Sequence, residues 1–169
     1  MRQRIMIIGQ PGSGKSALAR RLGAKLYLPV VHIDCIHWQS GWIERSAQEK
    51  GKLCSDVHAR SQWIFEGNHS NTWPERLERA NTLIWLDFPL LLRSFRILKR
   101  RVEYHGVARP DLPDGYPENI NWEFVSFVWQ TRSRGRAKMI EFYDAAPASK
   151  DKYRLLNRVD VDNVVKKLN

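Results

Sequence analysis

The stretch GQPGSGKS occupies residues 9–16 and fits the pattern G-x-x-x-x-G-K-[ST] at every required position. Its glycines let the backbone curl so that successive N–H groups point at phosphate oxygens, and a helix that begins there adds the positive end of its dipole. The pattern predicts that Lys15 reaches the β- and γ-phosphates of a nucleotide and that Ser16 offers its hydroxyl to Mg²⁺. The predicted nucleotide-binding residues are Gly9, Pro11, Gly12, Ser13, Gly14, Lys15, Ser16 and Ala17.

The segments on either side of this loop have the structure that the mechanism requires. Residues 4–8 are apolar and β-branched enough for a buried strand. Residues 17–27 carry Leu18, Leu22 and Leu26 four apart, which is one apolar stripe of a helix. A strand, a phosphate-binding loop and a helix therefore follow one another in the expected order.

The remainder of the chain continues this alternation of strands and helices. Such alternation predicts one α/β domain over residues 1–169, with a parallel sheet covered by helices on both faces. The predicted strands are 30–33, 63–65, 82–86 and 153–156. The predicted helices are 46–61, a helix beginning at Pro89, a long helix over 121–143 that Gly135 weakens, and 161–168.

Composition and charge narrow the class of protein. The 169 residues suit a single globular domain, and no apolar run approaches the roughly 18 residues of a membrane span. The net charge is +10, and the first 33 residues hold six basic side chains and no acid. Such a field favours polyanions, either nucleotides or nucleic acid. Cys35 and Cys54 have no metal-like spacing and are expected to be reduced thiols of a cytoplasmic protein.

Tryptophan is frequent for a chain of this size, with seven copies. Trp38 and Trp42 flank a short polar segment, where they would either form an aromatic wall for a bound ring or pack in the core. The tryptophans within predicted elements are expected in the core: Trp63, Trp85, Trp122 and Trp129.

Four segments of the chain resemble one known family. They are the GQPGSGKS loop, HIDCIHWQSGW after the second strand, WIFEGNH at the third, and LIWLDFP followed by an arginine-rich helix. Together they are similar to the DNA topology modulation (flagellar-regulator-related) proteins, within the wider adenylate-kinase-like P-loop group. The resemblance runs across nearly the whole chain. It implies a three-layer fold with sheet order 2-3-1-4-5, ATP binding and a kinase-like active site.

The resemblance also suggests roles for three acids. Asp34, after the second strand, would orient or deprotonate an acceptor hydroxyl, or bind a water of the metal. Glu66, at the third strand, stands where related kinases have Asp, and would serve the metal through water or the acceptor. Asp87, at the end of the fourth strand, is expected to be structural. Adenylate kinases carry an arginine where this chain has Ser70, so recognition of a nucleoside monophosphate is in doubt.

Arginines are grouped on two predicted helices. Arg93, Arg96 and Arg100 share one face of the helix after Pro89, and Arg132 and Arg136 share one face of the long helix. In adenylate-kinase-like enzymes, arginines from these regions neutralise charge on the transferring phosphoryl group as a lid closes. The resemblance therefore implies a short lid over about residues 103–135. Arg93, Arg132 and Arg136 are the arginines expected to act on phosphate.

The helix after Pro89 also carries an apolar stripe, formed by Leu91, Phe95, Leu98 and Val102.

Three functions fit these observations. The first is a Mg²⁺-dependent kinase that moves the γ-phosphate of ATP to a small hydroxyl acceptor, with Lys15, Asp34 and Glu66 at its centre. The second is a DNA-binding P-loop NTPase, as the family name and the charge of +10 suggest, although no nucleic-acid-binding module is visible. The third is a regulatory nucleotide sensor. The predicted partners are a nucleotide and an unidentified small acceptor, with nucleic acid as the alternative and no membrane.

Overall fold

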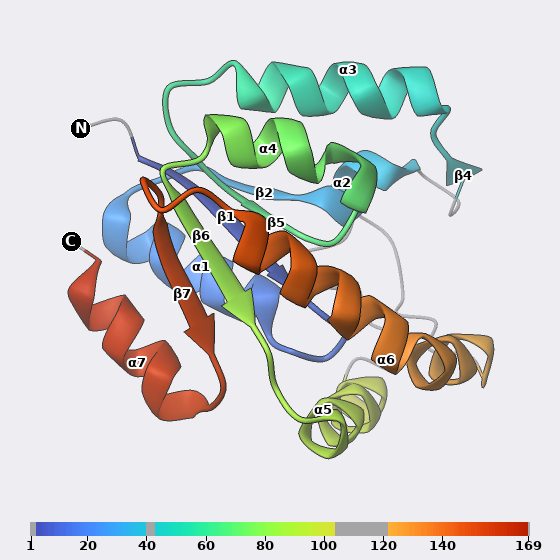
Figure 1. The fold of residues 1–169 in the computed structure, drawn as a ribbon. Helices are drawn as coiled ribbons and strands as arrows, with labels where there is room; N and C mark the ends of the chain where they lie inside the picture. The colour runs from blue at the N-terminus through green and yellow to red at the C-terminus, as the bar shows by residue number, and fades with distance from the viewer. Residues whose placement is uncertain (1–2, 40–42, 104–121, 169) are drawn as a thin grey trace.

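A five-stranded parallel sheet forms the centre of the computed structural model, which describes residues 3–39, 43–103 and 122–168 (Figure 1). Its strands lie in the order β2-β5-β1-β6-β7, which are the second, third, first, fourth and fifth strands of the sheet along the chain. The predicted α/β class and the order 2-3-1-4-5 are confirmed. The strands are β1 (Arg4–Gly9), β2 (Val30–His32), β5 (Trp63–Glu66), β6 (Thr82–Leu86) and β7 (Asp151–Leu155).

Helices cover both faces of the sheet, and the alternation of side chains along β1 shows how (Figure 1). Ile5 and Ile7 are buried on one face, whereas Met6 and Ile8 are buried on the other. Both faces must therefore be covered, as expected for a parallel sheet. The first face is covered by α1 (Lys15–Leu26) and α7 (Arg158–Lys167), and the second by α3 (Ala47–His58), α4 (Trp73–Arg79) and α6 (Trp122–Ala145).

Several short elements beyond β2 were not predicted. The helix α2 (Ile33–His37) begins directly after β2, so Asp34 lies in the first turn of a helix and not at the end of a strand. The hairpin of β3 (Trp38–Gln39) and β4 (Ile43–Glu44) follows. These elements are too short for sequence periodicity to reveal, because periodicity needs two or more turns of helix or several strand residues.

The helix α5 (Leu90–Glu103) turns its apolar stripe outward. Leu91 is 83% exposed and Phe95 is 63% exposed, whereas Arg93 is only 2% exposed. The helix lies beyond the carboxyl ends of the strands and packs on the loop 9–16, not on a face of the sheet (Figure 1). Its buried side therefore meets backbone carbonyls of a loop, which need donors such as arginine more than apolar groups.

The predicted tryptophan core is correct in part. Trp63 and Trp85 are fully buried, as expected. Trp129 is 56% exposed, so the expectation that it packs in the core is wrong. It lies in the first half of α6. Trp42 and the side chain of Trp122 lie outside the described residues.

The long helix α6 continues through Gly135 without a break. A Cβ atom at Gly135 would lie 3.2 Å from Gln10 Nε2, so the glycine makes room for a side chain of the loop 9–16. The predicted lid over about 103–135 lies partly outside the described residues, and its portion from residue 122 onward belongs to α6. No helix among the described residues is long and apolar enough to cross a membrane.

Candidate functional site

The loop 9–16 joins β1 to α1 and has the backbone that its glycines were expected to permit. Gly12 has a φ of 76° and Gly14 a φ of 93°, both in the left-handed region. A Cβ atom at Gly12 would lie 2.5 Å from the carbonyl oxygen of Arg93. Gly12 is therefore required both for the turn and for the close approach of α5.

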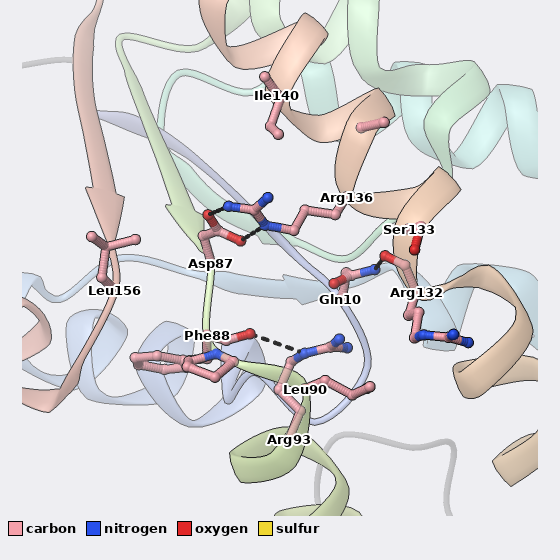
Figure 2. Close-up of a pocket in the computed structure, with 12 residues that line it drawn as sticks. Gln10, Asp87, Phe88, Leu90, Arg93, Arg132, Ser133, Arg136, Ile140 and Leu156 are labelled. Atoms are coloured by element: carbon pink, nitrogen blue, oxygen red, sulfur yellow. Dashed lines mark hydrogen bonds and ion pairs between the residues drawn. The ribbon is translucent and has the colours of Figure 1, made fainter.

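Two arginines of α5 bind the carbonyl side of this loop. Arg93 donates from Nε to Phe88 O at 3.1 Å (Figure 2) and from a terminal nitrogen to Pro11 O at 3.2 Å. Arg96 donates to Ser13 O at 3.0 Å. Because α5 binds carbonyl oxygens on one side of the loop, the loop keeps a shape that presents its N–H groups to a ligand on the other side. The structure thus places Arg93 at the loop, but with its guanidinium on loop carbonyls.

Ser16, Glu66 and His32 meet at the carboxyl ends of β1, β5 and β2. Ser16 Oγ donates to Glu66 Oε1 at 3.0 Å, and His32 Nδ1 lies 2.6 Å from the same oxygen. Burial alone would raise the pKa of Glu66, but the hydrogen bonds from His32 and Ser16 and the charge of Lys15 outweigh it and lower the pKa below its usual value. Glu66 is therefore a buried carboxylate that stays ionised beside the Ser16 hydroxyl.

Lys15 lies in the same group. Its ammonium donates to Gln10 O at 3.4 Å, and burial lowers its pKa, against the opposing charges of Glu66 and Asp34. Asp34 itself is exposed in the first turn of α2. The predicted residues Lys15, Ser16, Asp34 and Glu66 thus come together, and a ligand that brings negative charge would relieve the desolvated lysine.

A sharp turn after β5 fixes the direction of Glu66. Gly67 has a φ of 120°, and a Cβ atom there would lie 2.0 Å from Ile33 Cγ2, so only glycine fits. Arg76, which is fully buried, donates to Gly67 O at 3.0 Å and lies over the Phe65 ring. Burial lowers the pKa of Arg76 to about 10. This arginine holds the turn that carries Glu66 and Asn68.

Asp87 directly follows β6 and is held by two arginines. Arg136 of α6 donates to both its carboxylate oxygens at 2.8 and 2.9 Å (Figure 2). Arg154 of β7 donates to one of them at 2.6 and 3.1 Å. Burial would raise the pKa of Asp87, but these bonds lower it. The geometry agrees with the structural role expected for Asp87. The guanidinium of Arg136 is already engaged in an ion pair with this carboxylate. Arg154 has no motif signal and was not predicted.

A pocket of about 640 Å³ opens beside these residues, between the ends of β6 and β7, α5 and α6. Figure 2 shows Phe88 and Leu156 on one side of it and Gln10 and Arg132 on the other. Gln10 Nε2 donates to Arg132 O at 2.7 Å, which joins the loop 9–16 to α6. The Arg132 side chain lies over the Trp129 ring and donates to the backbone carbonyl oxygen of Trp129. Arg132 and Arg136 therefore border the pocket without contacting the loop through their guanidinium groups.

Oxygen donors suited to Mg²⁺ are present, although no group of three or more His, Cys, Asp or Glu side chains among the described residues is arranged to hold a metal ion. The hydroxyl of Ser16 and the ionised carboxylate of Glu66 are hard oxygen ligands, and Mg²⁺ keeps several waters and needs few protein ligands. The residues present thus fit a magnesium ion carried by nucleotide phosphates. His32 was missed from the sequence, where its only signal was its place two residues before Asp34.

The fold and the loop define an α/β P-loop protein. The chain belongs to the AAA domain family, which residues 5–111 match.

Solved structures share this fold over almost the whole chain. Shikimate kinase from Bacteroides thetaiotaomicron has 17% identity and a TM-score of 0.55, over 98% of this chain and 95% of that chain. Shikimate kinase from Acinetobacter baumannii in complex with shikimate has 14% identity and a TM-score of 0.56, over 98% and 90%. A gluconokinase from Sinorhizobium meliloti 1021 has 12% identity and a TM-score of 0.52, over 99% and 95%.

No curated protein matches the chain. At identities of 12–17%, the likeness to these three structures shows the fold alone. The resemblance to the DNA topology modulation proteins stays a prediction.

Proposed function

We propose that the protein is a Mg²⁺-dependent kinase that transfers the γ-phosphoryl group of ATP to a hydroxyl of a small acceptor. The observation that carries this proposal is the meeting of Lys15, Ser16 and Glu66, with Ser16 Oγ 3.0 Å from Glu66 Oε1. A loop that binds phosphates, a hydroxyl and an ionised carboxylate are the parts that phosphoryl transfer requires. The AAA domain family and the kinases that share the fold support it.

The loop 9–16 would hold the ATP phosphates with its N–H groups, its lysine and the N-terminus of α1. Ser16 would bind Mg²⁺ directly, and Glu66 or Asp34 would bind it through water. When bound, the metal would neutralise charge on the β- and γ-phosphate oxygens. Phe88 and Leu156 give the pocket beside the loop apolar walls, which suit the base of the nucleotide.

Two kinds of arginine serve this site in the proposal. Arg93 is a positioning residue, because its donors are bound to Pro11 and Phe88. Arg132 and Arg136 border the pocket, and each would have to leave its present partner to neutralise charge on the γ-phosphoryl group. Arg132 leaves only a neutral carbonyl and an indole ring, whereas Arg136 leaves a carboxylate. Arg132 is therefore the more accessible of the two.

The chemical step uses the carboxylate of Asp34. The oxygen of the acceptor hydroxyl forms a bond to the γ-phosphorus, and the bond from that phosphorus to the β,γ-bridging oxygen breaks. The hydroxyl proton passes to Asp34, and the products are ADP and a phosphate monoester. Asp34 suits this role because it is exposed and lies close enough to Lys15 to act on its charge.

The proposal is tested by ADP release from Mg·ATP, alone and with separate panels of nucleoside monophosphates, nucleosides, sugars and duplex DNA. We expect one small acceptor to raise turnover, and Lys15→Ala to reduce that turnover by about 10³-fold because the phosphates lose their cation. Lys52→Ala, at an exposed lysine of α3, is the matched control. Turnover that rises with DNA alone, without a phosphorylated product, would replace the kinase with a DNA-linked NTPase.

A further inference from the structure

Three aromatic side chains gather beyond the carboxyl ends of β2 and β5, and the proposed transfer step does not use them. His37 closes α2, Trp38 begins β3, and His69 follows β5 in the loop before α4. The centroids of the two imidazole rings are 5.5 Å apart, and the His37 ring meets Trp38 edge-on at 4.9 Å. All three residues are half-buried, so they share one partly open surface.

This surface adjoins the phosphate-binding loop. The N–H of Gly9 donates to Asn68 Oδ1 at 3.3 Å, so the residue before His69 is bound to the start of the loop. His37 follows Asp34 by three residues on α2, which places the two on one side of that short helix. The charge of Asp34 acts on both Lys15 and His37. The surface thus lies on the side from which Asp34 would receive an acceptor.

The cations around this surface are bound to protein acceptors. Lys50 donates to Glu44 at 2.6 Å, and one nitrogen of Arg45 donates to three carbonyl oxygens at 2.8 to 2.9 Å. The fully buried Arg76 is bound to Gly67 O and to Thr72 Oγ1 at 2.7 Å. Among the described residues of these segments, each of these cations already donates to a protein acceptor, so none of them is reserved for an anionic acceptor.

The two imidazoles are held neutral. Burial lowers the pKa of His37, and Lys50 lowers it further against the opposing charge of Glu44, which lies 3.3 Å from Nε2. Burial also lowers the pKa of His69, followed by the charges of His37, Lys50 and Arg76. A neutral imidazole has one donor and one acceptor nitrogen, and a hydroxyl group can likewise donate and accept. The pair is therefore matched to hydroxyl groups.

We propose that His37, Trp38 and His69 form the acceptor subsite and that the acceptor is an uncharged ring compound bearing hydroxyls, of the sugar or nucleoside class. The imidazoles bind its hydroxyls, the indole covers an apolar part of its ring, and Asp34 receives the reacting hydroxyl. This inference rests on the proposed kinase function and names its substrate class.

Two acceptor panels that differ in charge test the substrate class. The uncharged panel is adenosine, uridine, glucose and ribose, and the anionic panel is gluconate and shikimate, which add a carboxylate and keep several hydroxyls, together with AMP and UMP. ADP release and mass analysis of the product show which panel gains phosphate. We expect an uncharged member to be phosphorylated at least about tenfold faster than any anionic member, because each cation described at this surface is already bound to a protein partner and an added negative charge would lose water without gaining one. The arms separate nucleosides from sugars.

Variants then test the residues. His37→Phe and His69→Phe keep a ring of similar shape but remove the nitrogens, and each should raise KM for the uncharged acceptor by about tenfold while KM for ATP stays unchanged. Lys138→Met is the matched control, since Lys138 is an exposed cation of α6 that donates to Ser70 Oγ at 2.9 Å, next to His69 in the chain. Its KM for the acceptor should not change.

The outcomes separate this inference from the function on which it rests. Phosphorylation of an anionic acceptor, with Lys138→Met impaired and the histidine variants normal, would overturn the uncharged class and leave the kinase intact. Failure of both panels to gain phosphate would overturn the kinase and this inference together. Equal loss of ATP binding in the histidine variants would show a structural role and would also overturn the subsite.

Discussion

The two ends of the site are built from opposite chemistry. The nucleotide end, around the loop 9–16, is backed by the buried Arg93 and by Arg96 and contains the desolvated Lys15. The proposed acceptor end, beyond β2 and β5, has two imidazoles with lowered pKa values, the carboxylates of Asp34 and Glu44, and cations such as Lys50 that are bound to protein acceptors. In the proposed kinase, the cations of the nucleotide end would serve the phosphates, whereas those of the acceptor end are bound to protein partners. Each prediction below alters one end and asks whether the other responds.

The largest effect is expected at Glu66, which lies where the two ends meet. Glu66→Gln keeps the shape but removes the charge beside Ser16, so we expect turnover to fall about 10- to 100-fold and the Mg²⁺ concentration needed for half-maximal rate to rise. Magnesium titrations of the steady-state rate provide the measurement. Glu78→Gln, at an exposed carboxylate of α4, is the control. An unchanged magnesium requirement would remove Glu66 from the metal site.

The next effect concerns Asp87, which stabilises the nucleotide end without contacting the loop 9–16 in this structure. Asp87→Asn would leave Arg136 and Arg154 without their shared carboxylate, and we expect the free energy of unfolding to fall by about 2 kcal/mol. This is less than for a fully buried pair because both arginines are partly exposed. Urea denaturation measures it, and a midpoint equal to that of the unaltered protein would contradict the structural role.

Acid is expected to weaken the acceptor end. The pKa values of His37 and His69 lie below the value of about 6.5 for an unfolded histidine, so the unfolded chain takes up protons first as pH falls. Their contribution to stability is complete above about pH 6.5 and is lost as pH falls through the lower pKa of the folded protein. The charged groups that act on the pair are Asp34, Glu44, Lys50 and Arg76.

Urea denaturation at a series of pH values measures this loss. We expect the free energy of unfolding to decline below about pH 6.5, and the double variant His37→Phe/His69→Phe to decline less. Part of the slope will remain in the variant, because burial lowers the pKa of His58 as well. A slope identical in both proteins would show that the two imidazoles are not held neutral by the fold.

The smallest effect is expected on the outer side of α5. Leu91→Gln changes a side chain that is largely exposed, so stability should change by less than about 0.5 kcal/mol and turnover should not change. Ile97→Ala, on the buried side of the same helix, is the matched variant and should cost about 2 kcal/mol or more. Equal stability losses in thermal or urea denaturation would show that the apolar stripe is covered in solution.

Sequence patterns predicted the parts of this molecule that local rules determine. The motif at residues 9–16 has a fixed spacing, and the five strands follow from short apolar runs between helices, so both could be found from the chain alone. The resemblance supplied the strand order. Ser16 and Glu66 were predicted to act near one metal, and their side chains are in contact.

Contacts between segments far apart in sequence could not be predicted in this way. His37 and His69 meet because the sheet places β2 beside β5, the strands after which they lie. Asp87 and Arg154 meet because β6 lies beside β7. The sequence also did not reveal which side of α5 is buried. Its two stripes are equally clear in the sequence, and only its position over the loop 9–16 decides that the arginines of one stripe lie inside.

The fate of the γ-phosphate tests the central claim most directly. Protein is incubated with Mg²⁺, ATP labelled with ³²P at the γ position and the uncharged acceptor panel, and the labelled products are separated. The account predicts label in a phosphate monoester of one uncharged acceptor, and none above background with Lys15→Ala. Label that appears only as inorganic phosphate, at the same rate with and without acceptors, would contradict it.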